Sequence, residues 1–200
     1  MKSCYALENQ ITRRILRIAC ATALAVVFTV TLLQPAHADP VPNNIKVPGG
    51  NTAFLEGHAI GTQNYICLPS GWTFFGPQAT LFDADDRQVI THFLGPNPFE
   101  SDTARATWQH SGDTSTVWAM AIASSSNPGF VAPGAIPWLL LQVVGAQDGP
   151  TDGDELSETT FIQRVNTVGG IAPSTGCTPS DVGKKAFVPY EADYVFYEAD

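Results

Sequence analysis

Basic residues are scarce in this 200-residue chain, which has 10 Lys and Arg against 19 Asp and Glu. The formal net charge is −9 at pH 7, and no stretch of the sequence concentrates positive charge. An acidic surface of this kind repels phosphate backbones. The composition therefore argues against nucleic acid as a partner.

Long apolar runs are also lacking, with one exception at residues 18–33. This run is shorter than the roughly 20 residues that a membrane-spanning helix needs. Four basic residues precede it and the small-residue motif Ala36-His37-Ala38 follows it, which is the layout of a cleavable signal peptide. We therefore expect a signal peptide over residues 1–38, secretion to a periplasm or the extracellular space, and no membrane span after cleavage.

Cysteine is limited to four residues, of which Cys4 and Cys20 would leave with the signal peptide. Cys67 and Cys177 remain in the mature chain. Two thiols in an oxidising compartment most simply pair, so we expect a disulfide between them. The alternative is two unpaired, buried thiols.

No window of the mature chain has a 3.6-residue apolar period of helical length. Short runs of β-branched and aromatic residues alternate instead with turn signals, which predicts an all-β fold. We expect an extended lead-in over residues 39–51 with little to bury, then a single antiparallel β-sandwich, or a flattened barrel, over residues 52–200. Strands are expected at residues 52–60, 62–68, 72–75, 78–83, 87–94, 104–110, 116–124, 138–145, 159–167 and 186–198.

The residue pattern of three of these strands predicts which of their faces are buried, by alternation in two of them and by a continuous apolar run in the third. In the last strand, Tyr190, Ala192, Tyr194 and Phe196 lie on one side. The run 138–144 is nearly all apolar, which favours a strand covered on both faces in the middle of a sheet. In the strand 104–110, the residues Ala106, Trp108 and His110 share one side.

Four separated motifs resemble a secreted bacterial and fungal family catalogued as domain of unknown function 3455. They lie, in order, at residues 57–67, 135–141, 161–170 and 188–197. The resemblance spans about residues 50–199 and implies a secreted protein with Cys67 and Cys177 paired, but no established activity. Some fungal members have been labelled malate dehydrogenase, yet this sequence has no Gly-x-Gly-x-x-Gly after a strand.

Catalytic signatures are missing as well, since no Gly-x-Ser-x-Gly motif marks an activated serine. Whether the chain is an enzyme therefore stays open. His58, His92 and His110 lie in three different expected strands, where they could converge on a transition metal. The alternative is three separately placed histidines.

Carboxylates gather in two acidic loops, the first with Asp83, Asp85 and Asp86 and the second over residues 148–158. Oxygen ligands of this kind could hold Ca²⁺, although neither loop has the spacing of an EF-hand. Solvated turn residues are the alternative, so no cofactor is our first expectation. Arg164 shares a strand face with Ile162, and we expect it to pair with an acid or with carbonyl groups as a structural anchor, with functional anion binding as the alternative.

Aromatic residues supply the candidate binding groups. Trp72 follows an expected turn, and Trp108 shares a strand face with His110. Exposed aromatic side chains are common anchors of recognition sites. The sequence thus favours an exported, non-catalytic binding or surface-associated module for a cell-surface polymer, glycan or lipid, with a histidine-site metalloenzyme as the alternative.

Overall fold

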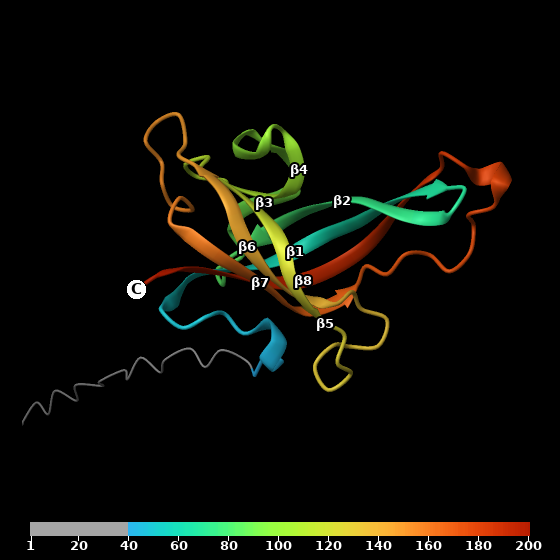
Figure 1. Cartoon of the computed structure of the whole chain (residues 1–200), viewed down its shortest axis with the longest axis horizontal. Helices are drawn as coiled ribbons and strands as arrows, with labels where there is room; N and C mark the ends of the chain where they lie inside the picture. The colour runs from blue at the N-terminus through green and yellow to red at the C-terminus, as the bar shows by residue number, and fades with distance from the viewer. Residues whose placement is uncertain (1–39) are drawn as a thin grey trace, which may run out of the picture. The chain divides into compact units, whose positions relative to one another are not determined.

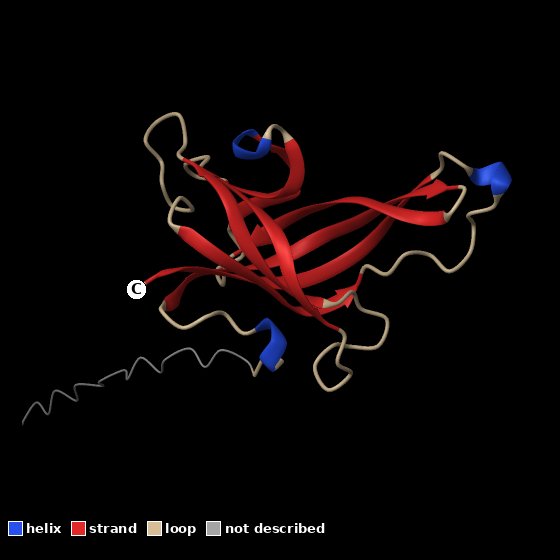
Figure 2. Cartoon of the chain, viewed as in Figure 1, coloured by secondary structure: helices blue, strands red, loops and turns tan. Residues whose placement is uncertain are grey.

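The structure is a computed structural model that describes residues 40–200. Eight strands and three short 3-10 helices make up this part of the chain (Figures 1 and 2). The strands are β1 (Asn51–Leu68), β2 (Gly71–Phe82), β3 (Gln88–Asn97), β4 (Thr103–His110), β5 (Thr116–Ser125), β6 (Trp138–Gln147), β7 (Thr159–Gly169) and β8 (Lys185–Ala199). The 3-10 helices are η1 (Asn43–Ile45), η2 (Pro98–Glu100) and η3 (Pro179–Asp181). The expected signal peptide at residues 1–38 lies outside the described residues, and no helix within 40–200 is long and apolar enough to cross a membrane.

The strands form a closed antiparallel barrel in chain order. Each strand pairs with its neighbours in sequence, and β1 closes the barrel by pairing with β8, where Ala59 lies opposite Ala192. The expected all-β antiparallel class is confirmed, and of the two expected architectures the chain has a closed barrel and not a sandwich. Alternation gives each strand one buried face in either architecture, so the pattern along single strands does not distinguish them.

The two long strands β1 and β2 each contain a glycine at a position where the sequence pattern predicts the end of one strand and the start of another. A Cβ at Gly61 would collide with the carbonyl oxygen of Gln78, so glycine permits the close approach of the two strands. Gly76, with a φ of 149°, lies where the register shifts between Asn64 and Tyr65. The expected strands 52–60 and 62–68 are therefore one strand, as are 72–75 and 78–83.

Large apolar side chains fill one half of the barrel interior, which we call the packed half. It consists of Leu81, Ile90, Val117, Leu156, Ile162 and Phe196, all 0% exposed. Burying a side chain of this size contributes about 1.5–3 kcal/mol relative to leaving it in water. The face predicted for β8 is confirmed, because Tyr190, Ala192, Tyr194 and Phe196 all lie in this interior cluster.

A second apolar cluster covers the outer face of β6 and β7. Trp138 and Leu140 of β6 pack there with Ile45 of the lead-in, which is 0% exposed. The lead-in is also tied down by a hydrogen bond from Gln163 Nε2 to the Ile45 carbonyl oxygen, at 2.6 Å. It thus buries more than its composition suggests. The expected cover on the outer face of β6 is present at Trp138 and Leu140 and ends at Gln142, which is exposed.

Beyond the barrel, β1 and β2 continue with β8 as a three-stranded extension, which we call the arm (residues 62–77 and 185–189). The arm lacks the neighbours that close the barrel, because β3 first pairs with β2 at Gln78 and β7 first pairs with β8 at Tyr190. Figure 1 shows these strand ends reaching away from the remaining strands toward η3.

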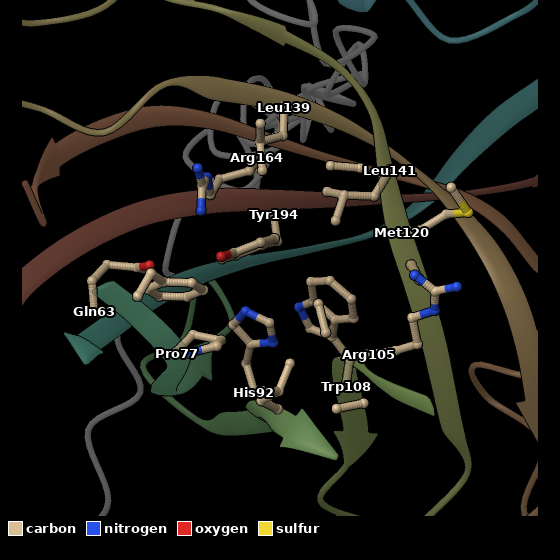
Figure 3. Close-up of a pocket in the computed structure, with 16 residues that line it drawn as sticks. Gln63, Pro77, His92, Arg105, Trp108, Met120, Leu139, Leu141, Arg164 and Tyr194 are labelled. Carbon is tan, nitrogen blue, oxygen red and sulfur yellow. The ribbon is translucent and has the colours of Figure 1, made fainter. Parts of the chain in front are cut away.

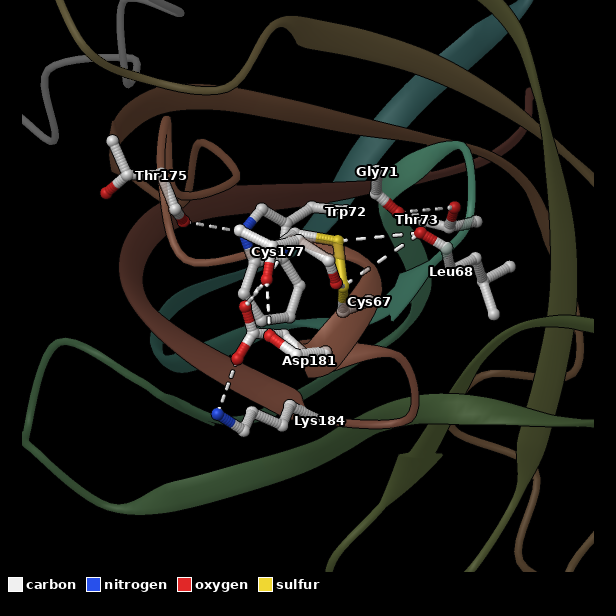
Figure 4. Close-up of a disulfide and its surroundings, with 11 residues drawn as sticks. Cys67, Leu68, Gly71, Trp72, Thr73, Thr175, Cys177, Asp181 and Lys184 are labelled. Atoms are coloured by element: carbon white, nitrogen blue, oxygen red, sulfur yellow. Dashed lines mark hydrogen bonds and ion pairs between the residues drawn. A yellow bond between two sulfur atoms is a disulfide. The ribbon is translucent and has the colours of Figure 1, made fainter.

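A disulfide between Cys67 and Cys177 fixes the tip of the arm to the loop before β8, which confirms the expected pairing (Figure 4). The two Cα atoms are 5.4 Å apart, and the bond joins positions separated by 110 residues. Backbone hydrogen bonds join the same segments, since Cys67 donates to Lys184 and accepts from Gly183. The loop 170–184 is therefore held by covalent and backbone contacts where few apolar side chains are available.

Candidate functional site

The other half of the barrel interior is a cavity of about 340 Å³. Its walls come from all eight strands, and Figure 3 shows Arg164, Tyr194 and Leu139 on one side with Pro77, His92 and Trp108 facing them. The lining is mostly apolar and includes four alanines. The lining residues are Phe74, Pro77, Leu94, Ala104, Ala106, Trp108, Ala119, Met120, Ala121, Leu139 and Leu141, together with the polar Gln63, His92, Arg105, Arg164 and Tyr194.

An apolar rim marks the mouth of the cavity. Phe74, Leu94 and Met120 line it and are 47%, 41% and 38% exposed. A second hollow, of about 430 Å³, lies beside β2 and β3 and shares Pro77 and Leu94 with the first. The mouth therefore offers exposed apolar surface leading to a lined interior, which is the usual form of a small-molecule site in a β-barrel.

His92 lies between the aromatic wall and the cavity. Its ring stacks on Trp108 with centroids 4.2 Å apart, and its Nδ1 donates to the Thr107 carbonyl oxygen at 2.8 Å. That bond leaves Nε2 without a proton, so it can act as an acceptor. Burial lowers the pKa of His92 to about 3, against the effect of the Thr107 bond and with help from the positive charge of Arg164.

Besides Arg164, two side chains of the lining have a nitrogen with no hydrogen-bond partner in residues 40–200. They are Gln63, through Nε2, and Trp108, through Nε1, and these residues are 3% and 0% exposed. A buried donor that stays unpaired costs about 1–3 kcal/mol. The cavity wall therefore holds hydrogen-bonding capacity that the described chain does not use.

Arg105 and Arg164 both line the cavity, but only Arg105 is paired with a carboxylate of the described chain. Arg105 makes a two-pronged ion pair with Glu100, with Nε and Nη2 each 2.8 Å from a carboxylate oxygen. This pair lowers the pKa of Glu100, chiefly through the hydrogen bond from Arg105. Arg164 donates through Nη2 to the Pro137 carbonyl oxygen at 2.8 Å, while its Nε is buried without a partner.

The expectation that Arg164 is anchored by carbonyl groups is thus met by the Pro137 contact. No carboxylate lies within 4.0 Å of its guanidinium in the described part of the chain. The sequence signal was a cation on a strand face with Ile162, which is 0% exposed. Gln63, Arg105 and Tyr194 gave no comparable signal.

The candidate binding residues of the sequence lie in three places. Trp108 lines the cavity, whereas Trp72 lies beside the disulfide and donates through Nε1 to the Thr175 carbonyl oxygen at 2.9 Å (Figure 4). His110 lies at the end of β4 and contacts Asp113 through Nδ1 at 2.9 Å. The structure does not bring Trp72 or His110 to the cavity.

The three histidines are likewise placed apart. His92 is in the interior, while the Nδ1 of His58 lies 2.7 Å from Asp193 on the outside of the barrel and His110 contacts Asp113. Within residues 40–200, no group of three or more His, Cys, Asp or Glu side chains is arranged to hold a metal ion. That finding also covers the two acidic loops, where Asp83 accepts hydrogen bonds from the backbone and guanidinium of Arg87.

Asp113, Ser115 and His110 form a cluster whose residue types suggest a hydrolase triad. The Ser115 hydroxyl, however, donates to Asp113 at 2.8 Å and accepts from the Leu156 backbone nitrogen at 3.1 Å. Burial acts to raise the pKa of Asp113, but hydrogen bonds from the backbone of Glu155 and Ser115 outweigh it and hold the pKa well below its usual value. The cluster therefore ties the turn after β4 to the loop that carries Leu156 into the packed half.

Comparison with protein families gives one match. The family model described as Protein of unknown function (DUF3455) matches residues 48–198, which include the whole barrel except Ala199, the last residue of β8. Searches of the curated proteins and of the solved structures gave no match.

Proposed function

Since the chain belongs to the DUF3455 family, whose function is unknown, we propose from its barrel that it is an exported binding protein that holds a small, largely apolar molecule in the interior cavity. The observation that carries this proposal is the cavity itself, an apolar hollow with an exposed apolar rim and a few polar groups that have no partner. Pockets of this size and composition are typical of small-molecule sites. Export is supported by the disulfide and by the charge and hydropathy pattern of residues 1–38.

Binding is favoured over acid–base catalysis by the state of His92. A general base works best when its pKa lies near the operating pH, and the pKa of His92 is about 3. Its unprotonated Nε2 serves better as a fixed acceptor for a ligand hydroxyl or amide. The partner expected from the sequence was a cell-surface polymer, glycan or lipid. The ligand proposed from the cavity is instead a small molecule that fits an interior space.

The proposal is tested with a neutral apolar fluorophore such as N-phenyl-1-naphthylamine and the purified chain. Ala106 lines the cavity, so Ala106→Phe fills part of it and should weaken binding at least tenfold. Ile122→Phe is the matched control, because Ile122 is 45% exposed and does not line the cavity. It should leave the affinity within about twofold. Equal affinity in the two variants, or no binding by the wild type, would contradict the proposal.

A further inference from the structure

We infer that the ligand of the cavity carries a carboxylate, and that Arg164 binds it. This inference rests on the proposed function, since it names the head group of the molecule that the cavity is proposed to hold. Arg164 is brought to the wall by β7, opposite Leu139 of β6 and Tyr194 of β8. All three residues line the cavity.

The first step of the argument is the unused bonding capacity of Arg164. Its Nη2 bonds to one carbonyl oxygen, its Nε is buried without a partner, and no carboxylate of the described chain is paired with it. Arg164 is half-buried, and a guanidinium partly removed from water without a counter-charge has anionic oxygen as its best partner. A ligand that brings such a group would supply that partner.

The second step is the contrast with Arg105 on the same cavity. Both prongs of Arg105 are taken by Glu100, so its charge is already neutralised within the protein. Arg164 alone of the two is left to bind an external anion. The remaining donors, Gln63 Nε2 and Trp108 Nε1, belong to residues of the same lining and are also unpartnered.

The third step fixes the class of anion. The planar fork of a guanidinium matches a carboxylate in two parallel hydrogen bonds. The rest of the wall is mostly apolar, and its other cation, Arg105, is paired with Glu100, which suits a ring or an alkyl chain and not a second charge. The volume of about 340 Å³ lies in the range of small-molecule pockets, so the ligand is a small molecule. We therefore assign the site to a small aromatic or medium-chain monocarboxylic acid.

The test measures displacement of the neutral fluorophore by matched pairs at pH 7. The pairs are trans-cinnamate with cinnamyl alcohol and nonanoate with 1-nonanol, and phenyl phosphate represents a different anion. Because a hydrogen bond to a charged group is worth about 1.5–3 kcal/mol, each acid should bind roughly 10- to 100-fold more tightly than its alcohol. In Arg164→Met this preference should fall to threefold or less, while the fluorophore still binds.

The control is Lys185→Met, which removes a cation that does not line the cavity and should keep the preference for acids. Arg164→Lys keeps the charge but loses the fork, so it should retain part of the preference and also serves if Arg164→Met does not fold. Equal binding of acid and alcohol by the wild type, a preference that survives in Arg164→Met, or tighter binding of phenyl phosphate would each overturn the inference. Failure of the fluorophore to bind would instead overturn the proposed function.

Discussion

The two halves of the barrel interior are built from the same strands but filled differently. β7 gives Ile162 to the packed half and Arg164 to the cavity, and β8 gives Phe196 to the first and contributes Tyr194 to the second. On β4 and β5 the cavity receives alanines, among them Ala106 and Ala119. The cavity therefore lies where small side chains line the interior and where β4 and β5 separate, because their pairing ends at Ala106 and Ala119.

The halves also differ in how completely polar groups are paired. All six side chains that define the packed half are apolar and 0% exposed, while the cavity wall contains Gln63, Trp108 and Arg164 with unpaired nitrogens. Unpaired buried groups reduce stability, and proteins retain such departures mainly at functional sites. The comparison indicates that the packed half stabilises the fold, whereas the unpaired nitrogens of the cavity wall lower the stability but remain available to bind a ligand.

The largest expected effect contrasts one truncation in each half. Phe196→Ala removes a ring that is 0% exposed and should lower the free energy of unfolding by about 3–5 kcal/mol. Leu94→Ala, at a rim residue that is 41% exposed, should lower it by less than about 1 kcal/mol. Urea denaturation of both variants measures the difference. Similar losses would show that the two halves do not divide stability as described.

The disulfide should stabilise the cavity side of the molecule more than the packed half. Replacing Cys67 and Cys177 together by Ala should cost about 2–4 kcal/mol, as removal of native disulfides typically does. Hydrogen exchange should accelerate first in the arm, which supplies Gln63, Phe74 and Pro77 to the cavity wall.

Reduction of the wild-type protein serves as the control for the cysteine variant, because it breaks the same bond without changing side-chain volume. The backbone amides of packed-half residues such as Ile90, Val117 and Ile162 should keep their protection from exchange in both samples. A uniform rise in exchange across β6 and β7 would contradict a local role for the bond.

Local features of the fold could be predicted from the sequence, but the closing of the sheet into a barrel could not. Alternation assigned Tyr190, Ala192, Tyr194 and Phe196 to the interior because each position depends only on its near neighbours. The pairing of β1 with β8 joins distant parts of the chain, and no pattern within either strand reports it. Gly61 was taken as a break because its role depends on the approach of Gln78 from another strand.

The candidate site was predictable only in part, for a related reason. Trp108 was expected to bind and does line the cavity, and Arg164 stood out as a cation on an apolar strand face. The difference between Arg164 and Arg105 depends on Glu100, whose contact with Arg105 is seen only in the folded chain. His92 was considered as a metal ligand, but its surroundings make it a neutral acceptor in the cavity wall.

The smallest expected effect concerns protonation of His92 at the boundary between the two halves. Its pKa is lowered from 6.5 to about 3 by burial, so the folded protein leaves it neutral while the unfolded chain binds a proton below pH 6.5. Stability must therefore fall as the pH decreases from 6.5 toward 3. Between pH 6.5 and 5.5 the loss should be about 1 kcal/mol.

His92→Phe keeps an aromatic ring against Trp108 and removes the titration. Because all other titrating groups are shared, the difference between the two unfolding free energies, measured by urea denaturation at each pH, isolates His92. Parallel pH profiles for the two proteins would show that His92 accepts a proton in the folded state as readily as in the unfolded chain.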